Sequence, residues 1–135
     1  MNKPATSVII TTMNNQNLGQ KGEDIAVKHL EKEGYKIRER NFWRRPFGEI
    51  DIVAQKKDKI IFVEVKTIEE QDDFSPEDEL TPKKYRCLLK MAEIYLKEKK
   101  LSQDTPCQID IIAITIKQTG GYKLLHYKNA VEDNP

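Results

Sequence analysis

The sequence predicts an α/β domain in which a mixed β-sheet of about five strands is flanked by two main helices, in the order α-β-β-β-α-β-β. Two long stretches, 17–33 and 82–100, carry apolar residues at helical spacing. Between and after them lie short stretches whose apolar residues alternate or run continuously, as in strands. Because a helix separates the third and fourth strands, these two strands can pair in parallel.

Length and composition indicate a single soluble domain. The chain has 135 residues, which is enough for one core, and we expect a flexible tail over 1–16 and one domain over 17–135. One third of the residues are charged and no long apolar run is present, so the sequence predicts neither a membrane span nor a signal peptide. The two cysteines, Cys87 and Cys107, are isolated, which favours the reducing cytoplasm over a disulfide framework.

The first helix is predicted from its capping residues and its apolar stripe. Asn17 and Gln20 form a capping box, and Gly34 suits the C-terminal end after Glu33. The stripe consists of Leu18, Gly22, Ile25, Ala26 and Leu30. Glu23 lies at the edge of this stripe, where an ordinary surface glutamate and an acid directed at a metal are both compatible with the spacing.

A β-hairpin follows from the alternation of apolar and polar residues. After a short strand at 35–38, the stretches 47–54 and 60–67 each alternate with a period of two. The polar residues 55–59 between them leave room for little more than a turn. The two strands are therefore expected to pair directly and antiparallel.

The register of this hairpin decides which charged residues meet. With the turn centred on 57–58, Asp51 lies opposite Glu64, and Glu49 lies opposite Lys66. Directly opposed Cβ atoms are about 5 Å apart. A turn longer by one residue would place the two sets on opposite faces of the sheet.

Two opposed carboxylates repel each other unless a cation lies between them. Mg²⁺ or Mn²⁺ bound to Asp51 and Glu64 would remove the repulsion, polarise a phosphoryl oxygen and acidify a bound water. Lys66 would stand beside the metal, where it could orient that water. The alternative is an ordinary charged surface of a half-exposed sheet. The charged residues share their face with apolar ones: Phe47, Val53, Ile60 and Phe62.

The second helix follows a polar loop at 69–80. Thr81 suits the N-cap, Pro82 suits the first helical position, and the helix is expected to extend to about Lys100. Its core face consists of Tyr85, Leu88, Leu89, Ala92, Tyr95 and Leu96. Lys84 lies in the first turn, where the helix dipole disfavours a cation, and this suggests that it serves an anionic partner.

The last two strands are predicted at 108–116 and 122–127. The first is dense in isoleucine, as in a central strand, and a Gly120-Gly121 turn separates the two. Asp110 and His126 lie on these strands. We expect both to be structural, with Asp110 contacting the backbone and His126 isolated and satisfied locally.

Charge distribution gives mixed indications about nucleic acid. The formal net charge is only +1, far from the excess of a typical DNA-binding domain. Before the hairpin, however, Arg44 and Arg45 lie among Phe42 and Trp43, and such residues suit phosphates and bases, although a solvated basic loop fits equally well. The acidic stretch 69–79 would repel a phosphate backbone.

Residues 22–130 resemble the small bacterial YraN-like (UPF0102) family of predicted endonucleases, which are relatives of the PD-(D/E)XK nucleases and of archaeal Holliday-junction resolvases. The matching landmarks are Gly22-Glu23, Gly34-Tyr35, Arg40-Asn41, Gly48-Glu49-Ile50-Asp51, Phe62-Val63-Glu64-Val65-Lys66-Thr67, Thr81-Pro82, Lys84, Asp110, His126 and Asn129-Ala130. This order is far more specific than the spacing of Asp, Glu and Lys alone. The sequence departs from the family at Ile68, where arginine is usual, and at Gln108-Ile109, where the family has Arg-Phe.

The resemblance implies a restriction-endonuclease-like core and a set of site residues. Asp51, Glu64 and the carbonyl of Val65 become ligands of Mg²⁺ or Mn²⁺, and Lys66 becomes the catalytic lysine. Glu23 becomes an outer acid directed at the metal or its waters. Glu49 and Lys84 are landmarks without a settled role, which we assign to substrate binding together with Arg44 and Arg45.

Two functional hypotheses follow from the sequence. The first is a Mg²⁺- or Mn²⁺-dependent endonuclease that acts on DNA, including branched or junction structures. The second is a non-catalytic nucleic-acid-binding or protein-interaction module that keeps the nuclease fold. The intact set of Asp51, Glu64 and Lys66 favours the first, whereas the near-neutral charge and Ile68 favour the second. A homodimer is expected only from the relatives.

Overall fold

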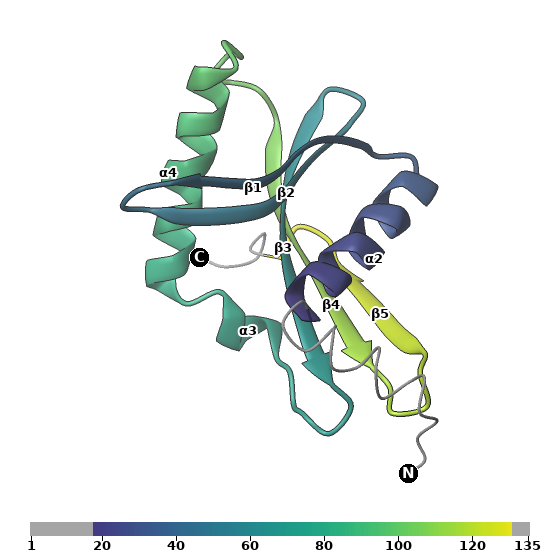
Figure 1. Cartoon of the computed structure of the whole chain (residues 1–135). Coiled ribbons are helices and arrows are strands. Elements are labelled where there is room, and N and C mark those ends of the chain that lie inside the picture. Colours follow the sequence, from purple (N-terminus) through teal and green to yellow (C-terminus); the bar gives the residue numbers. More distant parts are fainter. Residues whose placement is uncertain (1–17, 131–135) are drawn as a thin grey trace.

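The computed structural model describes residues 18–130, which form one twisted sheet between two long helices (Figure 1). The predicted tail and the predicted N-cap at Asn17 lie outside the described residues. The elements in chain order are α2 (Leu18–Lys32), β1 (Lys36–Arg44), β2 (Gly48–Lys56), β3 (Lys59–Glu69), α3 (Pro76–Glu79), α4 (Pro82–Glu98), β4 (Cys107–Ile116) and β5 (Tyr122–Tyr127).

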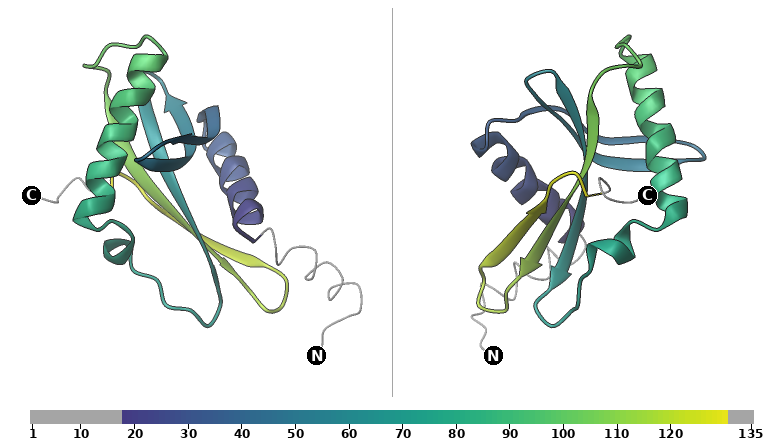
Figure 2. Two further views of the ribbon diagram at one scale, coloured as in Figure 1. Left: turned by 60° about the vertical axis from the view of Figure 1, so that its left-hand side comes forward. Right: turned by 180° about the vertical axis from the view of Figure 1, so that it is seen from behind.

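The sheet has five strands in the order β1-β2-β3-β4-β5. All neighbours are antiparallel except β3 and β4, which pair in parallel from Ile60↔Cys107 to Glu69↔Ile116. The connection between these two strands runs through α4 (Figure 2). The predicted mixed sheet and element order are therefore confirmed.

The two faces of the sheet carry separate cores, one under each long helix. On the α4 face, Tyr95 packs edge-to-face on Phe42 and Phe62, with ring centroids 5.2 and 5.8 Å apart. On the α2 face, Ala26 and Leu30 are fully buried among apolar residues of the central strands. No helix in the described residues is long and apolar enough to cross a membrane.

The first strand is longer than predicted. The prediction ended at Arg38, but β1 extends to Arg44 and pairs with β2 as far as Arg44↔Gly48. Its second half is rich in charged residues, so it lacks the apolar alternation that identifies a strand. The ladder with β2 satisfies its backbone nonetheless, and the β1–β2 hairpin forms an arm that lies across α4 (Figure 1).

The remaining boundaries agree with the prediction to within a few residues, apart from one short helix. Thr81 caps α4 by accepting a hydrogen bond from the Lys84 N–H, as expected of this N-cap. Within the predicted loop 69–80, residues Pro76–Glu79 form α3. This helix is a single turn, which is too short for the spacing of apolar residues to distinguish it from a loop.

Asp110 is the centre of a buried polar chain that links β4, β5 and α2. Its Oδ1 accepts hydrogen bonds from the Asn129 N–H and the Gln108 side chain, both at 2.8 Å. Its Oδ2 lies 2.7 Å from His126 Nε2, and His126 Nδ1 lies 3.0 Å from Nε2 of His29 on α2. The backbone contact predicted for Asp110 is confirmed, whereas the prediction that His126 is isolated is wrong.

A close contact fixes α2 against β3 beside the charged residues of the hairpin. A Cβ atom added at Gly22 would lie 1.8 Å from Oγ1 of Thr67 and 3.0 Å from its Cβ. The Thr67 hydroxyl is buried and has no hydrogen-bond partner among the described residues. Only glycine therefore permits this approach, and the approach sets the position of the next residue, Glu23.

The Gly22→Ala variant is expected to lower the free energy of unfolding by about 2 kcal/mol, because overpacking outweighs the gain in helix propensity. Urea denaturation at equilibrium would measure this change. Gly19→Ala is the matched control, because no atom lies within 4 Å of a Cβ at that position of the same helix. The double variant Gly22→Ala/Thr67→Ala should recover part of the loss, and strictly additive effects would refute the contact as the cause.

Candidate functional site

The predicted charged cluster lies where β2 and β3 separate. Their ladder runs from Lys56↔Lys59 to Ile52↔Val63, so the predicted register, with the turn at 57–58, is confirmed as far as that pair. The ladder ends before Glu49 and Lys66, so the prediction that these two residues lie opposite each other is wrong: Glu49 pairs with Trp43 of β1 and Lys66 with Ala113 of β4. Asp51 and Glu64 lie immediately beyond this last pair, where β2 continues into the arm and pairs only with β1. In place of a ladder bond, Oδ2 of Asp51 accepts a hydrogen bond of 2.8 Å from the Val65 N–H.

The electrostatic environment of Asp51 opposes its ionisation. Burial raises the pKa of Asp51 to about 7, and the neighbouring carboxylate of Glu64 adds to the rise. Glu23 and Glu49 contribute in the same direction, and only the Val65 N–H acts against it. Burial also raises the pKa of Glu64. The acids predicted to form the site therefore lie near enough to repel one another in a partly dry environment.

Lys84 supplies the counter-charge to Glu64. Its Nζ lies 2.6 Å from Oε2 of Glu64 and 3.9 Å from Oε1 of Glu79. Burial acts to lower the pKa of Lys84, but the hydrogen bond and charge of Glu64 outweigh it and the pKa is raised. The prediction that Lys84 meets an anion in the first turn of α4 agrees with this geometry, and the anion present is the side chain of Glu64.

Lys66 lies on the same side as Lys84 and shares its second partner. Its Nζ is 3.5 Å from Oε2 of Glu79, and its side chain is 42% exposed. Glu79 thus holds both lysines beside Glu64, although the sequence analysis assigned it no role. The only indication of a role for Glu79 in the sequence was its position just before the Thr81 cap, within an acidic stretch.

Asn41 is a second residue that the sequence analysis missed. It adopts φ = 54°, and its Nδ2 donates to both Glu23 (3.1 Å) and Glu49 (2.9 Å). Asparagine tolerates this left-handed backbone better than most residues. Arg40 adds charge nearby, with its guanidinium 3.7 Å from Glu23. The only signal for Asn41 was its presence among the family landmarks.

Of the two arginines predicted to bind substrate, Arg44 lies away from this cluster. Arg44, at the end of β1, forms a two-pronged ion pair with Glu98, including a 2.8 Å bond from its Nε. Glu98 ends α4 whereas Lys84 begins it, and 14 residues of helix span about 21 Å. The guanidinium of Arg45 lies over the Trp43 ring, 5.7 Å from its centroid. The structure therefore does not bring Arg44 to the carboxylates.

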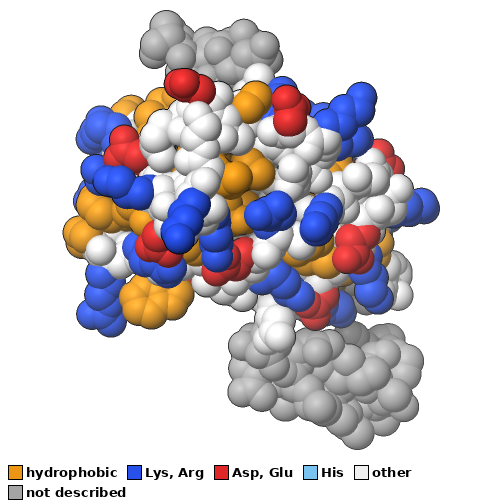
Figure 3. Space-filling model, turned by 90° about the horizontal axis from the view of Figure 1, so that it is seen from above, with side chains coloured by type: hydrophobic (Ala, Val, Ile, Leu, Met, Phe, Trp, Pro, Cys, Tyr) orange, Lys and Arg blue, Asp and Glu red, His pale blue; other side chains and the backbone are white. Residues whose placement is uncertain are grey.

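The upper end of the molecule in Figure 1, which carries the C-terminal end of α4 and the β2–β3 turn, has a mixed surface. Figure 3 shows Lys and Arg side chains over much of this face, with Asp and Glu side chains and apolar groups between them. This face offers dispersed positive charge and no continuous basic groove.

The donor atoms at the β2–β3 gap fit a hard divalent cation that keeps part of its water. No three His, Cys, Asp or Glu side chains are gathered to hold a metal within residues 18–130. Mg²⁺ typically uses one or two carboxylates and retains several waters. Asp51 and Glu64 provide two carboxylates. Because the N–H and C=O of a strand residue point to the same side, the carbonyl of Val65 also faces Asp51.

Comparison with known proteins identifies a family match over most of the chain. The model of "Uncharacterised protein family UPF0102" matches residues 22–114. This range includes Asp51, Glu64, Lys66 and Lys84.

Similar proteins come from diverse bacteria. A UPF0102 protein of Bacteroides fragilis is 43% identical over 113 residues, covering 84% of this chain and 90% of its own length. One from Flavobacterium johnsoniae is 46% identical over 99 residues, with coverage of 72% and 80%. One from Syntrophomonas wolfei is 42% identical over 121 residues, with coverage of 86% and 98%. None of these names states an activity.

Proposed function

The chain belongs to the uncharacterised protein family UPF0102, and we propose that it is a divalent-metal-dependent endonuclease that hydrolyses phosphodiester bonds of DNA. Branched or junction DNA is included in the proposed substrates. The observation that supports this most is the partly buried pair Asp51 and Glu64, set at the end of a β-ladder with two lysines beside it. Two carboxylates held together in a partly buried site cost free energy unless a cation binds to them.

In this proposal, Asp51, Glu64 and the carbonyl of Val65 hold Mg²⁺ or Mn²⁺. A bound ion of this kind would polarise the phosphate and acidify a coordinated water. Glu23 and Glu49 accept hydrogen bonds from Asn41, which fixes both carboxylates toward the same region. Their role is to orient water and to maintain the negative potential that attracts the cation.

The two lysines bind and orient the substrate. Lys66 is 42% exposed and Lys84 is 36% exposed, so each presents its ammonium group to solvent while Glu79 holds it beside Glu64. A phosphate next to Glu64 would meet both ammonium groups. Lys66 then orients the attacking water or stabilises the negative charge that develops on the phosphorus oxygens.

The proposal includes membership of the PD-(D/E)XK superfamily, with the mixed sheet as its restriction-endonuclease-like core. Asp51 and the run Glu64-Val65-Lys66 would be its defining motif. It also includes a cytoplasmic location, which the free thiols of Cys87 and Cys107 favour. A homodimer would suit a symmetric junction.

Cleavage of a panel of DNA structures tests the proposal. With Mg²⁺ or Mn²⁺, the wild type should cleave at least one substrate among duplex, single-stranded, flap and four-way-junction DNA, and chelation should stop the reaction. Lys66→Ala should lower the rate by about 100-fold or more, as expected when a charge-stabilising group is lost. Lys97→Ala, an exposed lysine on α4 without an ion pair to the described residues, should cleave as the wild type does.

Two results would count against the nuclease. Cleavage that survives Lys66→Ala would point to a contaminant or to another site. Binding of DNA without cleavage under every metal would favour the non-catalytic module, in which Lys84 permanently neutralises Glu64.

A further inference from the structure

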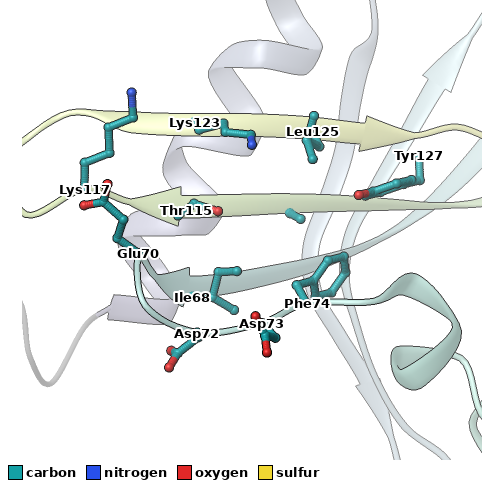
Figure 4. A pocket seen from close by; sticks show the side chains of 11 residues that line it. Ile68, Glu70, Asp72, Asp73, Phe74, Thr115, Lys117, Lys123, Leu125 and Tyr127 are labelled. Atoms are coloured by element: carbon teal, nitrogen blue, oxygen red, sulfur yellow. The ribbon is translucent and has the colours of Figure 1, made fainter.

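A second concave site lies on the sheet face that carries the lysines. It is a pocket of about 310 Å³ that lies over the ends of β3, β4 and β5 and is closed on one side by the loop after β3 (Figure 4). Its floor is apolar, formed by Ile68, Ala113 and Leu125, and Leu125 is 44% exposed. Solvent-exposed leucine on a sheet face costs free energy, so an occupant would gain from covering it.

The pocket is adjacent to the candidate metal site. Ile68 follows Lys66 by two residues on β3, so the two side chains share one face of the strand. The long helix α4 covers the other end of this face, where its side chains pack on Phe62 of β3 and Ile109 of β4 as well as on β2 (Figures 1 and 2). A chain bound at Lys66 could therefore continue across β3, β4 and β5 without meeting a helix.

The rims of the pocket differ in chemistry. Lys117 and Lys123 lie on the rim formed by β5 and the β4–β5 turn, and neither forms an ion pair with the described residues (Figure 4). On the opposite rim, Oδ2 of Asp72 accepts a hydrogen bond from the Glu69 N–H. Glu70 accepts one from the Gln118 N–H at 3.0 Å, which ties the loop to the β4–β5 turn.

Aromatic rings close the end of the pocket nearest α3. Phe74 of the loop and Tyr127 of β5 lie with their centroids 6.0 Å apart at an interplanar angle of 43° (Figure 4). The pocket thus combines an aromatic end, an apolar floor, a cationic rim and a rim of hydrogen-bond acceptors. A nucleotide has the matching parts: an aromatic base, a phosphate, and amino or hydroxyl donors.

We propose that this pocket binds an unpaired nucleotide of the nucleic acid strand whose phosphate lies at Lys66. Lys117 and Lys123 contact its phosphates, the base lies on Ile68 and Leu125 beside the two rings, and the loop carboxylates accept hydrogen bonds from the base. The inference rests on the proposed function for its substrate class. It narrows that class to DNA with a single-stranded segment next to the reacting phosphate.

The lysines of one rim, which form no ion pair with the described residues, favour nucleic acid over an apolar protein segment, whereas Glu70, Asp72 and Asp73 gather on the opposite rim. A protein helix or strand would leave the ammonium groups of Lys117 and Lys123 without anionic partners. Unpaired bases can reach the floor, whereas the stacked bases of a continuous duplex cannot. The acidic rim also disfavours a second phosphate backbone, so a single strand fits better than a double helix.

Binding in chelator separates this site from cleavage. Fluorescence anisotropy with labelled oligonucleotides in EDTA should show tighter binding of single-stranded DNA than of a blunt duplex of equal length. Lys117→Ala/Lys123→Ala should weaken single-strand binding by about 10-fold and make the slope of log K against log[salt] shallower by about 1.4, because two phosphate contacts are lost. Lys28→Ala/Lys97→Ala removes the same charge from two exposed helix positions and should change binding less than two-fold.

Leu125→Asp tests the floor independently of the lysines. Because this side chain is already 44% exposed, the variant should fold, which thermal unfolding can verify, and single-strand binding should again weaken by about 10-fold. Three results would each overturn the proposal. They are an equal loss of single-strand affinity in the Lys117/Lys123 variant and the Lys28/Lys97 control, unchanged single-strand affinity of Leu125→Asp, and tighter binding of the duplex than of the single strand. Single-strand binding at this pocket without metal-dependent cleavage would support the pocket and refute the nuclease. Metal-dependent cleavage that requires Lys66 but is unchanged in these variants would support the nuclease and refute the pocket.

Discussion

Replacing Asp51 with asparagine is expected to raise the free energy of unfolding at pH 8 by roughly 2 to 4 kcal/mol. The physical reason is the cost of ionising this carboxyl group in the folded protein. Its surroundings combine burial with the negative charge of Glu64, Glu23 and Glu49. Asparagine removes that charge, while its carbonyl oxygen can still accept the hydrogen bond from the Val65 N–H.

The sign of the pH dependence follows from the direction of the shift. The pKa of Asp51 is about 7 in the folded protein against an ordinary value of 3.8. The folded state therefore holds this proton more tightly than the unfolded state does. The stability linked to it is fully present below pH 3.8 and is lost as the pH rises through 7. The advantage of Asp51→Asn should consequently be largest above pH 7 and small near pH 4.

The same substitution should abolish the response to metal. Mn²⁺ at 100 times its dissociation constant would stabilise the wild type by about 2.7 kcal/mol, and would stabilise Asp51→Asn far less. Thermal unfolding between pH 4 and pH 8, with and without Mn²⁺, measures both effects. DNA cleavage should be lost together with the metal response, even though the variant is the more stable protein.

The matched control is Asp104→Asn, which makes the same chemical change at an exposed position. Its free energy of unfolding should stay within about 0.5 kcal/mol of the wild type at every pH. An Asp51→Asn protein that is less stable than the wild type at pH 8 would contradict the prediction. It would show that other groups of the metal-free protein already offset the repulsion between the carboxylates. Equal stabilisation of the wild type and Asp51→Asn by Mn²⁺ would place the ion elsewhere.

The central part of the site could be predicted because it depends on local rules. A period of two in both strands and a turn at 57–58 fix which side chains oppose each other, and the paired residues Ile52↔Val63 confirm that register. The N-cap at Thr81 likewise requires only neighbouring residues. The resemblance then added Glu23 to the predicted site, and its charge contributes to the raised pKa of Asp51.

The residues that were missed act through tertiary contacts. Glu79 belongs to a one-turn helix and forms ion pairs with both Lys66 and Lys84. No local sequence pattern predicts these contacts, because the three residues lie on different elements. Asn41 bridges α2 and β2 from a left-handed backbone position on β1. Arg44 was predicted to bind substrate from its residue type and its aromatic neighbours in the sequence, but it forms a long-range ion pair with Glu98 instead.

His126 shows the same limit in the interior. From the sequence it was expected to be isolated, because its two partners lie 16 and 97 residues away. Burial lowers the pKa of His29, and the neighbouring His126 acts in the same direction. The chain of Asp110, His126 and His29 thus connects three elements on the α2 face, away from the α4 face that carries Lys84 and Phe62.

Removing the carboxyl group of Asp110 is expected to cost about 3 to 5 kcal/mol of unfolding free energy. Asp110 is fully buried, and three donors would lose their acceptor at once: Asn129 N–H, the Gln108 amide and the His126 ring. Urea denaturation of Asp110→Ala at pH 7.5 measures this loss. The rate of DNA cleavage per folded molecule should not change, because the hydrogen-bonded residues Asp110, His126 and His29 do not contact Asp51 or Glu64. A loss of activity in the folded variant would instead show that Asp110 takes part in catalysis.

Asp110→Asn separates the hydrogen bonds from the charge. In the wild type, Oδ2 is an acceptor, so His126 donates from Nε2 and accepts from His29 at Nδ1. An asparagine amide would instead donate to Nε2, and both imidazoles can adopt the other tautomer and keep every hydrogen bond in reversed direction. The expected cost is then only about 1 to 2 kcal/mol. Imidazole ¹⁵N spectra should show the His126 proton moving from Nε2 to Nδ1, and an unchanged tautomer together with an alanine-sized loss would contradict the reversal.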